Sequence, residues 1–233
     1  MTAAHIDRDG VWCQVLRRPA GGYRRPALFL DRDGVVNEDT DYLHRVEDLR
    51  LIPGVARTIA AANRRRLPVV LVTNQGGIGL GRFGWPEFAR LQDALLARLR
   101  ARGALVDAVF ACPYHPRGTG PLRHPDHPDR KPRPGMLLRA AAALDLDLGK
   151  SWIVGDKLDD LAAGRAAGLA GGIHVLGGHG RAHRARARLF GGPRYRVVLV
   201  RSLGEAAGRL PILAPTPSPA NTKNANNKNR EDL

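Results

Sequence analysis

The residues best suited to chemistry are Asp31 and Asp33, which directly follow the apolar run Leu28-Phe29-Leu30. Such a run is typical of a buried strand, and a parallel sheet opens into its ligand crevice at the carboxyl ends of its strands. One carboxylate of the pair can attack or bind a metal while the other transfers a proton. Both can reach one ligand only if the chain turns, and Gly34 permits that turn. The alternative is an Asp-Gly turn without chemistry.

A near copy of this motif, Asp7-Arg8-Asp9-Gly10, occurs earlier in the chain. It is preceded by Thr2-Ala3-Ala4-His5, which lacks the character of a buried strand, whereas the second copy follows Ala27-Leu28-Phe29-Leu30. We therefore assign the chemistry to the second copy. A substitution of Asp7 is expected to leave turnover intact.

Two further segments carry groups that suit a phosphate. Thr73-Asn74-Gln75-Gly76 follows an apolar run, and its hydroxyl, amides and flexible backbone can donate hydrogen bonds to phosphate oxygens. Lys131 lies in a proline-rich segment that would fix its charge stiffly, and Arg130 adds a guanidinium fork. Taken alone, the first segment could be a loop with a capping threonine, and the second a surface dipeptide.

A cluster of acids follows another apolar run, in Gly155-Asp156-Lys157-Leu158-Asp159-Asp160. Such carboxylates can hold a hard divalent cation through oxygen ligands, and Mg²⁺ is the natural choice beside phosphate. Asp159 or Asp160 could instead cap the next helix. The four motifs fall at four successive strand ends of one predicted sheet, and this coincidence favours a functional site over four unrelated turns.

The elements that must position these residues are five apolar runs that alternate with helical patterns. The helical stripe of Phe88, Leu91, Leu95 and Leu99 follows Pro86 at a plausible first turn. Alternation of this kind specifies an α/β fold, a Rossmann-like three-layer sandwich with a mainly parallel sheet. The loops after Gly34 and Pro113 are short, so we expect no large cap domain. The predicted strands are 27–31, 68–73, 108–112, 151–155 and 172–176, and a strand over 195–200 and a helix over 203–210 complete the domain.

Length and composition set the broad class. The chain has 233 residues, of which 43% are hydrophobic, and this suits one domain with a sizeable core. No apolar run approaches a membrane span and residues 1–10 lack a signal-peptide core, so we expect a soluble cytoplasmic protein. Cys13 and Cys112 are too few for a disulfide framework, and we expect free thiols.

The formal net charge of +15 favours an anionic partner. Arginine is concentrated between Arg181 and Arg196, which raises the alternative of a basic nucleic-acid-binding protein. Such a run without interleaved aromatic residues is more often a solvated face, so a small anionic substrate is the favoured partner and specific nucleic-acid binding is not expected.

The order of Asp31-x-Asp33-Gly34, Thr73-Asn74, Lys131-Pro132 and Gly155-Asp156 with Asp160 resembles the four motifs of the haloacid dehalogenase (HAD) superfamily of phosphohydrolases. The longer matches, from Asp31 to Asn37 and from Thr73 to Ile78 among them, resemble more closely the families of D-glycero-D-manno-heptose 1,7-bisphosphate 7-phosphatases and histidinol-phosphate phosphatases. The similarity runs from about Ala27 to Leu176, with weaker agreement through Leu210.

This resemblance implies a role for each matching residue. Asp31 would be the nucleophile that forms an aspartyl-phosphate, and Asp33 would protonate the leaving group and then activate water. Mg²⁺ would lie between the Asp31 carboxylate, the backbone carbonyl of Asp33 and Asp156. Thr73 and Lys131 would hold the transferring phosphoryl group. The substrate-binding residues would be Asp39, Thr40, Asp41, Tyr42, Asn74, Gln75, Gly76, Arg130 and Lys157.

The chain departs from the resemblance in one loop. Members of these families often hold a structural zinc through Cys-x-His and Cys-x-Cys before the Arg-Lys pair. Here the stretch reads Cys112-Pro113-Tyr114-His115 and then His127-Pro128-Asp129. A rearranged site of Cys112, His115, His127 and also His124 is chemically feasible, but a good zinc site keeps four ligands in suitable geometry. We favour a loop stiffened by its prolines without zinc.

We therefore expect a monomeric, Mg²⁺-dependent phosphatase of a small sugar bisphosphate, with heptose 1,7-bisphosphate losing its 7-phosphate as the first candidate. A histidinol-phosphate phosphatase is the alternative within the same class. The phosphatase domain would span residues 27–210, between an N-terminal arm over 1–26 and a disordered tail over 211–233. Val11–Leu16 could be an extra edge strand, but the surrounding arginines and glycines favour an arm.

Overall fold

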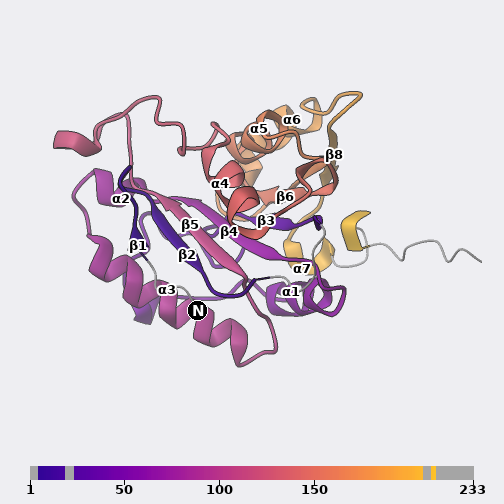
Figure 1. The fold of residues 1–233 in the computed structure, drawn as a ribbon, viewed down its shortest axis with the longest axis horizontal. Helices are drawn as coiled ribbons and strands as arrows, with labels where there is room; N and C mark the ends of the chain where they lie inside the picture. Colours follow the sequence, from indigo (N-terminus) through magenta and orange to yellow (C-terminus); the bar gives the residue numbers. More distant parts are fainter. Residues whose placement is uncertain (1–4, 19–23, 207–210, 214–233) are drawn as a thin grey trace, which may run out of the picture.

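A single eight-stranded sheet forms the centre of the molecule (Figure 1). The computed structural model describes residues 5–18, 24–206 and 211–213. The strand order is β1-β2-β5-β4-β3-β6-β7-β8. Pairing from β5 to β8 is parallel throughout, which confirms the predicted α/β class. The strands are β1 (His5–Ile6), β2 (Trp12–Val15), β3 (Leu28–Leu30), β4 (Val69–Asn74), β5 (Ala108–Cys112), β6 (Trp152–Gly155), β7 (Gly171–His174) and β8 (Arg196–Leu199).

The N-terminal segment is part of the sheet, and the expectation of a separate arm is wrong for it. β2 pairs antiparallel with β5, and β1 pairs with β2. The reason is packing: the Trp12 ring stacks on Trp85 at 5.6 Å between centroids and meets Phe88 edge-on at 5.1 Å. This burial of aromatic surface outweighs the arginines and glycines nearby.

Helices cover both faces of the sheet, as Figure 1 shows. Successive side chains of a strand point to opposite faces, so Leu28 and Leu30 pack in one core and Phe29 in the other. The first core contains α1 (Val55–Arg64), α3 (Trp85–Arg100) and α7 (Leu203–Ala206), and the second contains α4 (Gly135–Leu144), α5 (Leu158–Ala166) and α6 (Gly180–Arg188). The predicted stripe of α3 is buried throughout.

Short elements fill the connections at the carboxyl edge. Between β3 and α1 lies one turn of 3-10 helix, η1 (Val46–Asp48), and β4 leads into the four-residue α2 (Gly76–Gly79). The loop after β5 carries η2 (Gly120–Leu122). A further short helix, η3 (Leu148–Lys150), precedes β6 and therefore lies at the opposite, amino edge. No large cap domain is inserted among these described segments, as predicted. None of the described helices has the length and apolarity needed to cross a bilayer.

The predicted C-terminal boundary needs a correction. Residues 211–213, which we assigned to the disordered tail, form the 3-10 helix η4 (Pro211–Leu213), and Leu213 is buried in the first core. α7 ends at Ala206, and residues 207–210 of the predicted last helix lie outside the described part. The rest of the predicted tail, 214–233, also lies outside it.

Candidate active site

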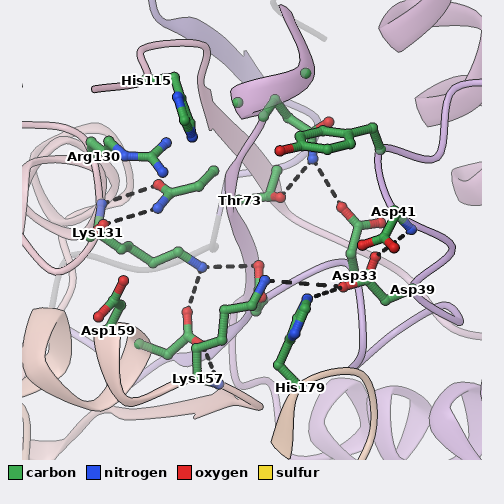
Figure 2. Close-up of a pocket in the computed structure, with 17 residues that line it drawn as sticks. Asp33, Asp39, Asp41, Thr73, His115, Arg130, Lys131, Lys157, Asp159 and His179 are labelled. Atoms are coloured by element: carbon green, nitrogen blue, oxygen red, sulfur yellow. Dashed lines mark hydrogen bonds and ion pairs between the residues drawn. The ribbon is translucent and has the colours of Figure 1, made fainter. Parts of the chain in front are cut away.

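A cavity of about 240 Å³ opens at the carboxyl ends of β3, β4, β5 and β6. Polar side chains dominate its lining, as the close-up in Figure 2 shows. All four sequence motifs contribute, so the predicted meeting of strand ends is what the fold produces. The lining residues are Asp31, Asp33, Asp39, Asp41, Tyr42, Thr73, Asn74, Gln75, Gly76, Gly77, His115, Arg130, Lys131, Lys157, Asp159, Asp160 and His179.

Asp31 and Lys131 form the floor of this cavity. The Nζ of Lys131 lies 2.9 Å from Oδ1 of Asp31 and 2.6 Å from Oδ1 of Asp160, and it donates to the carbonyl of Val72 at 2.7 Å. The same Oδ1 of Asp31 accepts the Arg32 N–H at 2.8 Å. Both contacts therefore use one oxygen of Asp31, and Oδ2 is left available for attack.

The main chain at Lys131 is fixed by Asn74. The Asn74 Oδ1 accepts the Lys131 N–H at 3.0 Å, and the Asn74 Nδ2 donates to the Lys131 carbonyl at 2.9 Å. An amide of this kind holds a peptide unit from both sides. The strand end of β4 thus sets the position of a lysine that lies 57 residues away in sequence.

Three buried carboxylates, those of Asp31, Asp156 and Asp160, offer oxygen atoms that all lie within 4.8 Å of one another. Burial, reinforced by the other carboxylates, raises the pKa of Asp156 to about 8. Burial also raises the pKa of Asp31 to about 6, although Lys131 opposes the shift. Such a cluster is costly without a cation.

The donor atoms of this cluster suit a hard divalent ion. Asp156 Oδ2 accepts the His179 N–H at 2.7 Å, but its Oδ1 is buried with no hydrogen-bond partner. Asp160 is occupied differently: Oδ1 contacts Lys131 and Oδ2 accepts the Lys157 N–H at 3.1 Å, which caps α5 as its sequence position suggested. Asp31 and Asp156 are therefore the carboxylates free to bind a metal.

Asp33 is held away from that cluster. Arg32 donates to both of its oxygens, at 3.0 and 2.9 Å, and Asn37 and Gln75 add bonds at 2.8 and 3.0 Å. Burial alone would raise the pKa of Asp33, but Arg32 and these donors lower it below its ordinary value. Asp33 is thus an ionised carboxylate at the cavity wall. Arg32, which sequence reasoning left without a role, is buried and holds it.

Thr73 is oriented by Gln75. The Gln75 Nε2 donates to Oγ1 of Thr73 at 2.8 Å, so the hydroxyl of Thr73 accepts that bond and its own hydrogen can point elsewhere. Thr73 is almost fully buried and lines the cavity. It can therefore donate to an anion there.

One rim of the cavity is built around Asp39. Its Oδ2 lies 3.4 Å from Nε2 of His179 and 4.0 Å from Nζ of Lys157. Asp41 and Tyr42 follow with backbone φ angles of 51° and 67°, which residues other than glycine rarely adopt. Thr40, predicted to bind substrate, is instead exposed and outside the cavity lining.

Arg130 and His115 both lie near Gly76, where a Cβ would meet His115 Cδ2 at 2.9 Å and Arg130 Nη1 at 3.6 Å. Nη1 of Arg130 donates to the carbonyl of Tyr114 at 2.6 Å. Figure 2 shows this pair across the cavity from Asp39 and Asp41. Because Gly76 has no side chain, the cavity stays open beside His115 and Arg130.

The residues considered for zinc do not come together. His115 lines the cavity. The ring of His127 stacks on the Tyr114 ring at 3.8 Å between centroids, and the His124 ring meets the His127 ring edge-on at 5.1 Å. Cys112 ends β5 inside the second core, and burial raises its pKa to about 12. Among the described residues, only Asp31, Asp156 and Asp160 have a geometry that could hold a metal ion.

Some cavity residues were missed by sequence reasoning. His179 follows two glycines that are distant in sequence from every motif, and the sequence around it gives no sign of a site. Gly77, Asp159 and Asp160 were not missed in this way, because they lie inside motifs recognised in the sequence, and the structure places all three at the cavity. The first motif copy, in contrast, contributes nothing to the cavity.

Comparison with known proteins identifies the family. A HAD-hydrolase-like family model matches residues 129–206. The chain is 52% identical over 172 residues to a D-glycero-beta-D-manno-heptose-1,7-bisphosphate 7-phosphatase of Mesorhizobium japonicum, covering 74% of this chain and 79% of that protein. The corresponding enzyme of Escherichia coli K12 is 38% identical, with 65% and 78% covered.

Solved structures agree. A HAD-like phosphatase from Mesorhizobium loti is 42% identical with a TM-score of 0.78, covering 91% of this chain and 98% of that one. The D,D-heptose 1,7-bisphosphate phosphatase of B. bronchiseptica, complexed with magnesium and phosphate, is 34% identical with a TM-score of 0.66, covering 78% and 96%. The resemblance in the sequence is confirmed: this chain is a HAD-superfamily phosphatase and belongs to the heptose-1,7-bisphosphate phosphatase family.

Proposed function

We propose that this protein removes the 7-phosphate of D-glycero-D-manno-heptose 1,7-bisphosphate, with Asp31 as the nucleophile and Mg²⁺ as the cofactor. The observation that carries the proposal is Asp31 itself, buried beside Lys131 and Asp156 beneath a cavity lined with phosphate-binding groups. The names of the 52% and 38% identical relatives support this substrate.

The charge balance of the cavity supports a metal cofactor. The carboxylates of Asp31, Asp33, Asp39, Asp41, Asp159 and Asp160 outnumber the cationic side chains of Arg130, Lys131 and Lys157. A phosphate dianion would be repelled by this excess of negative charge. Asp31 and Asp156, with the carbonyl of Asp33, would hold Mg²⁺, which neutralises charge and polarises the phosphoryl oxygens when bound.

In the first step, Oδ2 of Asp31 attacks phosphorus and the bond to the sugar oxygen breaks. Asp33 is ionised in the resting site, so it takes up a proton that enters with the substrate's monoanionic phosphate and gives it to the leaving alkoxide. The Thr73 hydroxyl donates to a phosphoryl oxygen, and Lys131 can pass one of its hydrogen bonds from Asp31 to the phosphoryl group. The products are the sugar monophosphate and phosphorylated Asp31.

In the second step, water attacks the aspartyl-phosphate and Asp33 takes its proton. The lowered pKa of Asp33 means that it is ionised and ready for this role. Cleavage of the acyl phosphate restores Asp31 and releases inorganic phosphate. The proton that Asp33 has gained then leaves with the inorganic phosphate, which restores the ionised carboxylate, so the cycle balances.

Recognition of the rest of the substrate falls to the cavity rim. Arg130 and Lys157 are cations that can meet the phosphate that is not transferred, and Asp39 and Asp41 can accept hydrogen bonds from sugar hydroxyls. A cavity of about 240 Å³ suits a small metabolite. A monomeric state and a cytoplasmic location stay predictions.

Nucleic-acid binding is not favoured. Arg181, Arg186 and Arg188 of α6 are exposed, and the cavity lining includes none of them. The intact set of catalytic groups is better explained by hydrolysis. Histidinol phosphate is the competing substrate, because its phosphatases are expected to share the same catalytic residues.

Phosphate release from a panel of phosphomonoesters decides the substrate. We expect the highest kcat/KM for heptose 1,7-bisphosphate, and equal or better efficiency with histidinol phosphate would reject the assignment. Arg130→Ala should chiefly raise KM for the bisphosphate, whereas Lys131→Ala should lower kcat by about a hundredfold or more on all substrates. Equal losses from both variants on every substrate would contradict this division.

A further inference from the structure

The guanidinium of Arg139 on α4 binds three carboxylates at once, outside the active site. Its Nε and Nη2 donate to the two oxygens of Asp129 at 2.7 and 2.9 Å. Its Nη1 donates to Asp7 at 2.5 Å, and Nη2 also donates to Asp9 at 2.6 Å. Arg139 thus joins α4, the loop that precedes Arg130, and the first copy of the Asp-Arg-Asp-Gly motif.

This contact is more specific than an ordinary surface ion pair. Three acids share one guanidinium, and Asp129 is bound in the bidentate geometry that only arginine offers. Asp129 is buried, so its position is defined by the surrounding structure as well as by Arg139. The hydrogen bonds to Asp129 are the main cause of the raised pKa of Arg139.

A chain of contacts runs from this cluster to the active site. The Tyr114 hydroxyl donates to the carbonyl of Asp9 at 2.7 Å, and the carbonyl of Tyr114 accepts from Nη1 of Arg130 at 2.6 Å. The Tyr114 ring stacks on His127, and the His127 carbonyl accepts the Arg130 N–H at 2.9 Å. Arg130 is therefore held at its side chain by Tyr114, which contacts the N-terminal hairpin formed by β1 and β2, and at its main chain by His127, which stacks on Tyr114.

Lys131, the next residue, does not depend on these contacts. Asn74 fixes its main chain from β4, and Asp31, Asp160 and Val72 bind its ammonium group. A disturbance of the hairpin should consequently displace Arg130 while Lys131 stays in place. The two neighbours would then report separately on recognition and on turnover.

We propose that Asp7, Asp9 and Arg139 are positioning residues: they form a clamp that orients Arg130, through Tyr114 and Asp129, toward the phosphate that the enzyme does not remove. The clamp rests on the proposed function, since it presumes a bisphosphate substrate. It assigns a task to the motif copy that catalysis does not use.

The test compares Arg139→Gln and Tyr114→Phe with the control Arg133→Gln, whose exposed pair with Asp126 lies in the same loop. For Arg139→Gln we expect KM for heptose 1,7-bisphosphate to rise about tenfold with kcat changed less than about twofold. Kinetic constants for p-nitrophenyl phosphate, which has one phosphate, should be unchanged. Tyr114→Phe loses one hydroxyl and should raise the bisphosphate KM about threefold, and Arg139→Lys should restore part of the loss.

Amide hydrogen exchange gives a readout that needs no substrate. Peptides from residues 113–130 should exchange faster in Arg139→Gln than in the wild type, and Arg133→Gln should match the wild type. If Arg139→Gln does not fold, the single-hydroxyl variant Tyr114→Phe is measured in its place.

The outcomes separate the clamp from the proposed function. If the wild-type enzyme prefers the bisphosphate and Arg139→Gln leaves the KM for the bisphosphate unchanged, the clamp alone is overturned. Equal losses of Arg139→Gln on the bisphosphate and on p-nitrophenyl phosphate would also overturn the clamp alone. A wild-type enzyme without activity on the bisphosphate would overturn the proposed function. In that case hydrogen exchange would still test whether the clamp supports Arg130. Unchanged exchange of the 113–130 peptides in Arg139→Gln would overturn the clamp.

Discussion

The two Asp-Arg-Asp-Gly segments of this protein, residues 7–10 and 31–34, have the same sequence and different chemistry. The first is the turn of the β1–β2 hairpin at the sheet edge, where the Asp7 N–H donates to the Val11 carbonyl. The second follows β3 in the middle of the sheet, between β4 and β6. Both glycines have positive φ, 70° for Gly10 and 83° for Gly34, so the turns are alike.

The difference lies in what neighbouring elements bring to the carboxylates. Asp7 and Asp9 meet the guanidinium of Arg139, so the protein itself supplies their cation. At the second copy, Asp31 meets Lys131, but it also meets two more buried acids, and Oδ1 of Asp156 has no partner. The strand that delivers the motif, and the strands beside it, decide whether the motif is structural or catalytic.

The largest expected effect sharpens this contrast at the first aspartate. Asp31→Asn removes the nucleophile and should lower kcat by about a thousandfold or more, whereas Asp7→Asn should leave kcat within about twofold of the wild type. Steady-state phosphate release measures both. A dead Asp7→Asn enzyme beside an active Asp31→Asn enzyme would reverse the assignment of the two copies.

The second aspartate should show a smaller contrast. Asp33→Asn removes a proton carrier and should lower kcat by about a hundredfold or more, with the largest loss on substrates that have poor leaving groups. Asp9→Asn should not change kcat. The comparison of an alkyl phosphate with p-nitrophenyl phosphate checks the acid role, and an equal loss on both would argue against proton donation to the leaving group.

Magnesium should distinguish the copies by stability. At a hundred times its Kd, Mg²⁺ should stabilise the fold by about 2.7 kcal/mol, which is about 5–10 °C in Tm for a chain of this size. Asp156→Asn should abolish this shift, and Asp7→Asn should preserve it because Arg139 already serves that cluster. Thermal unfolding with EDTA or Mg²⁺ measures the shift, and its retention in Asp156→Asn would place the ion elsewhere.

The glycines give the smallest contrast. An alanine Cβ at Gly34 would lie 2.8 Å from Oδ2 of Asp156, and one at Gly10 would lie 2.8 Å from the Tyr114 hydroxyl. Both changes should destabilise the fold by about 1–3 kcal/mol because of the positive φ. Only Gly34→Ala should also weaken Mg²⁺ binding. Denaturant unfolding and a magnesium titration of each variant check this, and equal magnesium affinities would count against the geometry at Asp156.

The parts of the fold that sequence could predict are those with strong local patterns. The apolar runs that became β3 to β7 and the stripe of α3 are fully or largely buried, and burial on both faces produces runs that periodicity detects. β2 was harder, because its place depends on Trp12 meeting Trp85 and Phe88 across more than seventy residues. The sequence around β2 alone does not indicate such a contact.

The same distinction holds for the site. Strand-end motifs pointed to Asp31, Thr73 and Asp156 because their position follows from the sheet. His179 reaches the cavity only through the loop that follows β7, and Arg32 gained its role through bonds to Asp33 that no spacing rule encodes. Loop residues of this kind are placed by tertiary contacts, so they need the structure.

The N-terminal hairpin has one more consequence, for solubility. β2 pairs with the residues from Ala108 to Ala111 of β5, and all of β5, Ala108–Cys112, is buried. A chain shortened to begin at Ala27 would leave the β5 peptide groups that face β2 unpaired and in water, although β4 still pairs with the other side. Such an open edge is a template for any extended segment that meets it. We expect such a protein to self-associate, even though every catalytic group is still present.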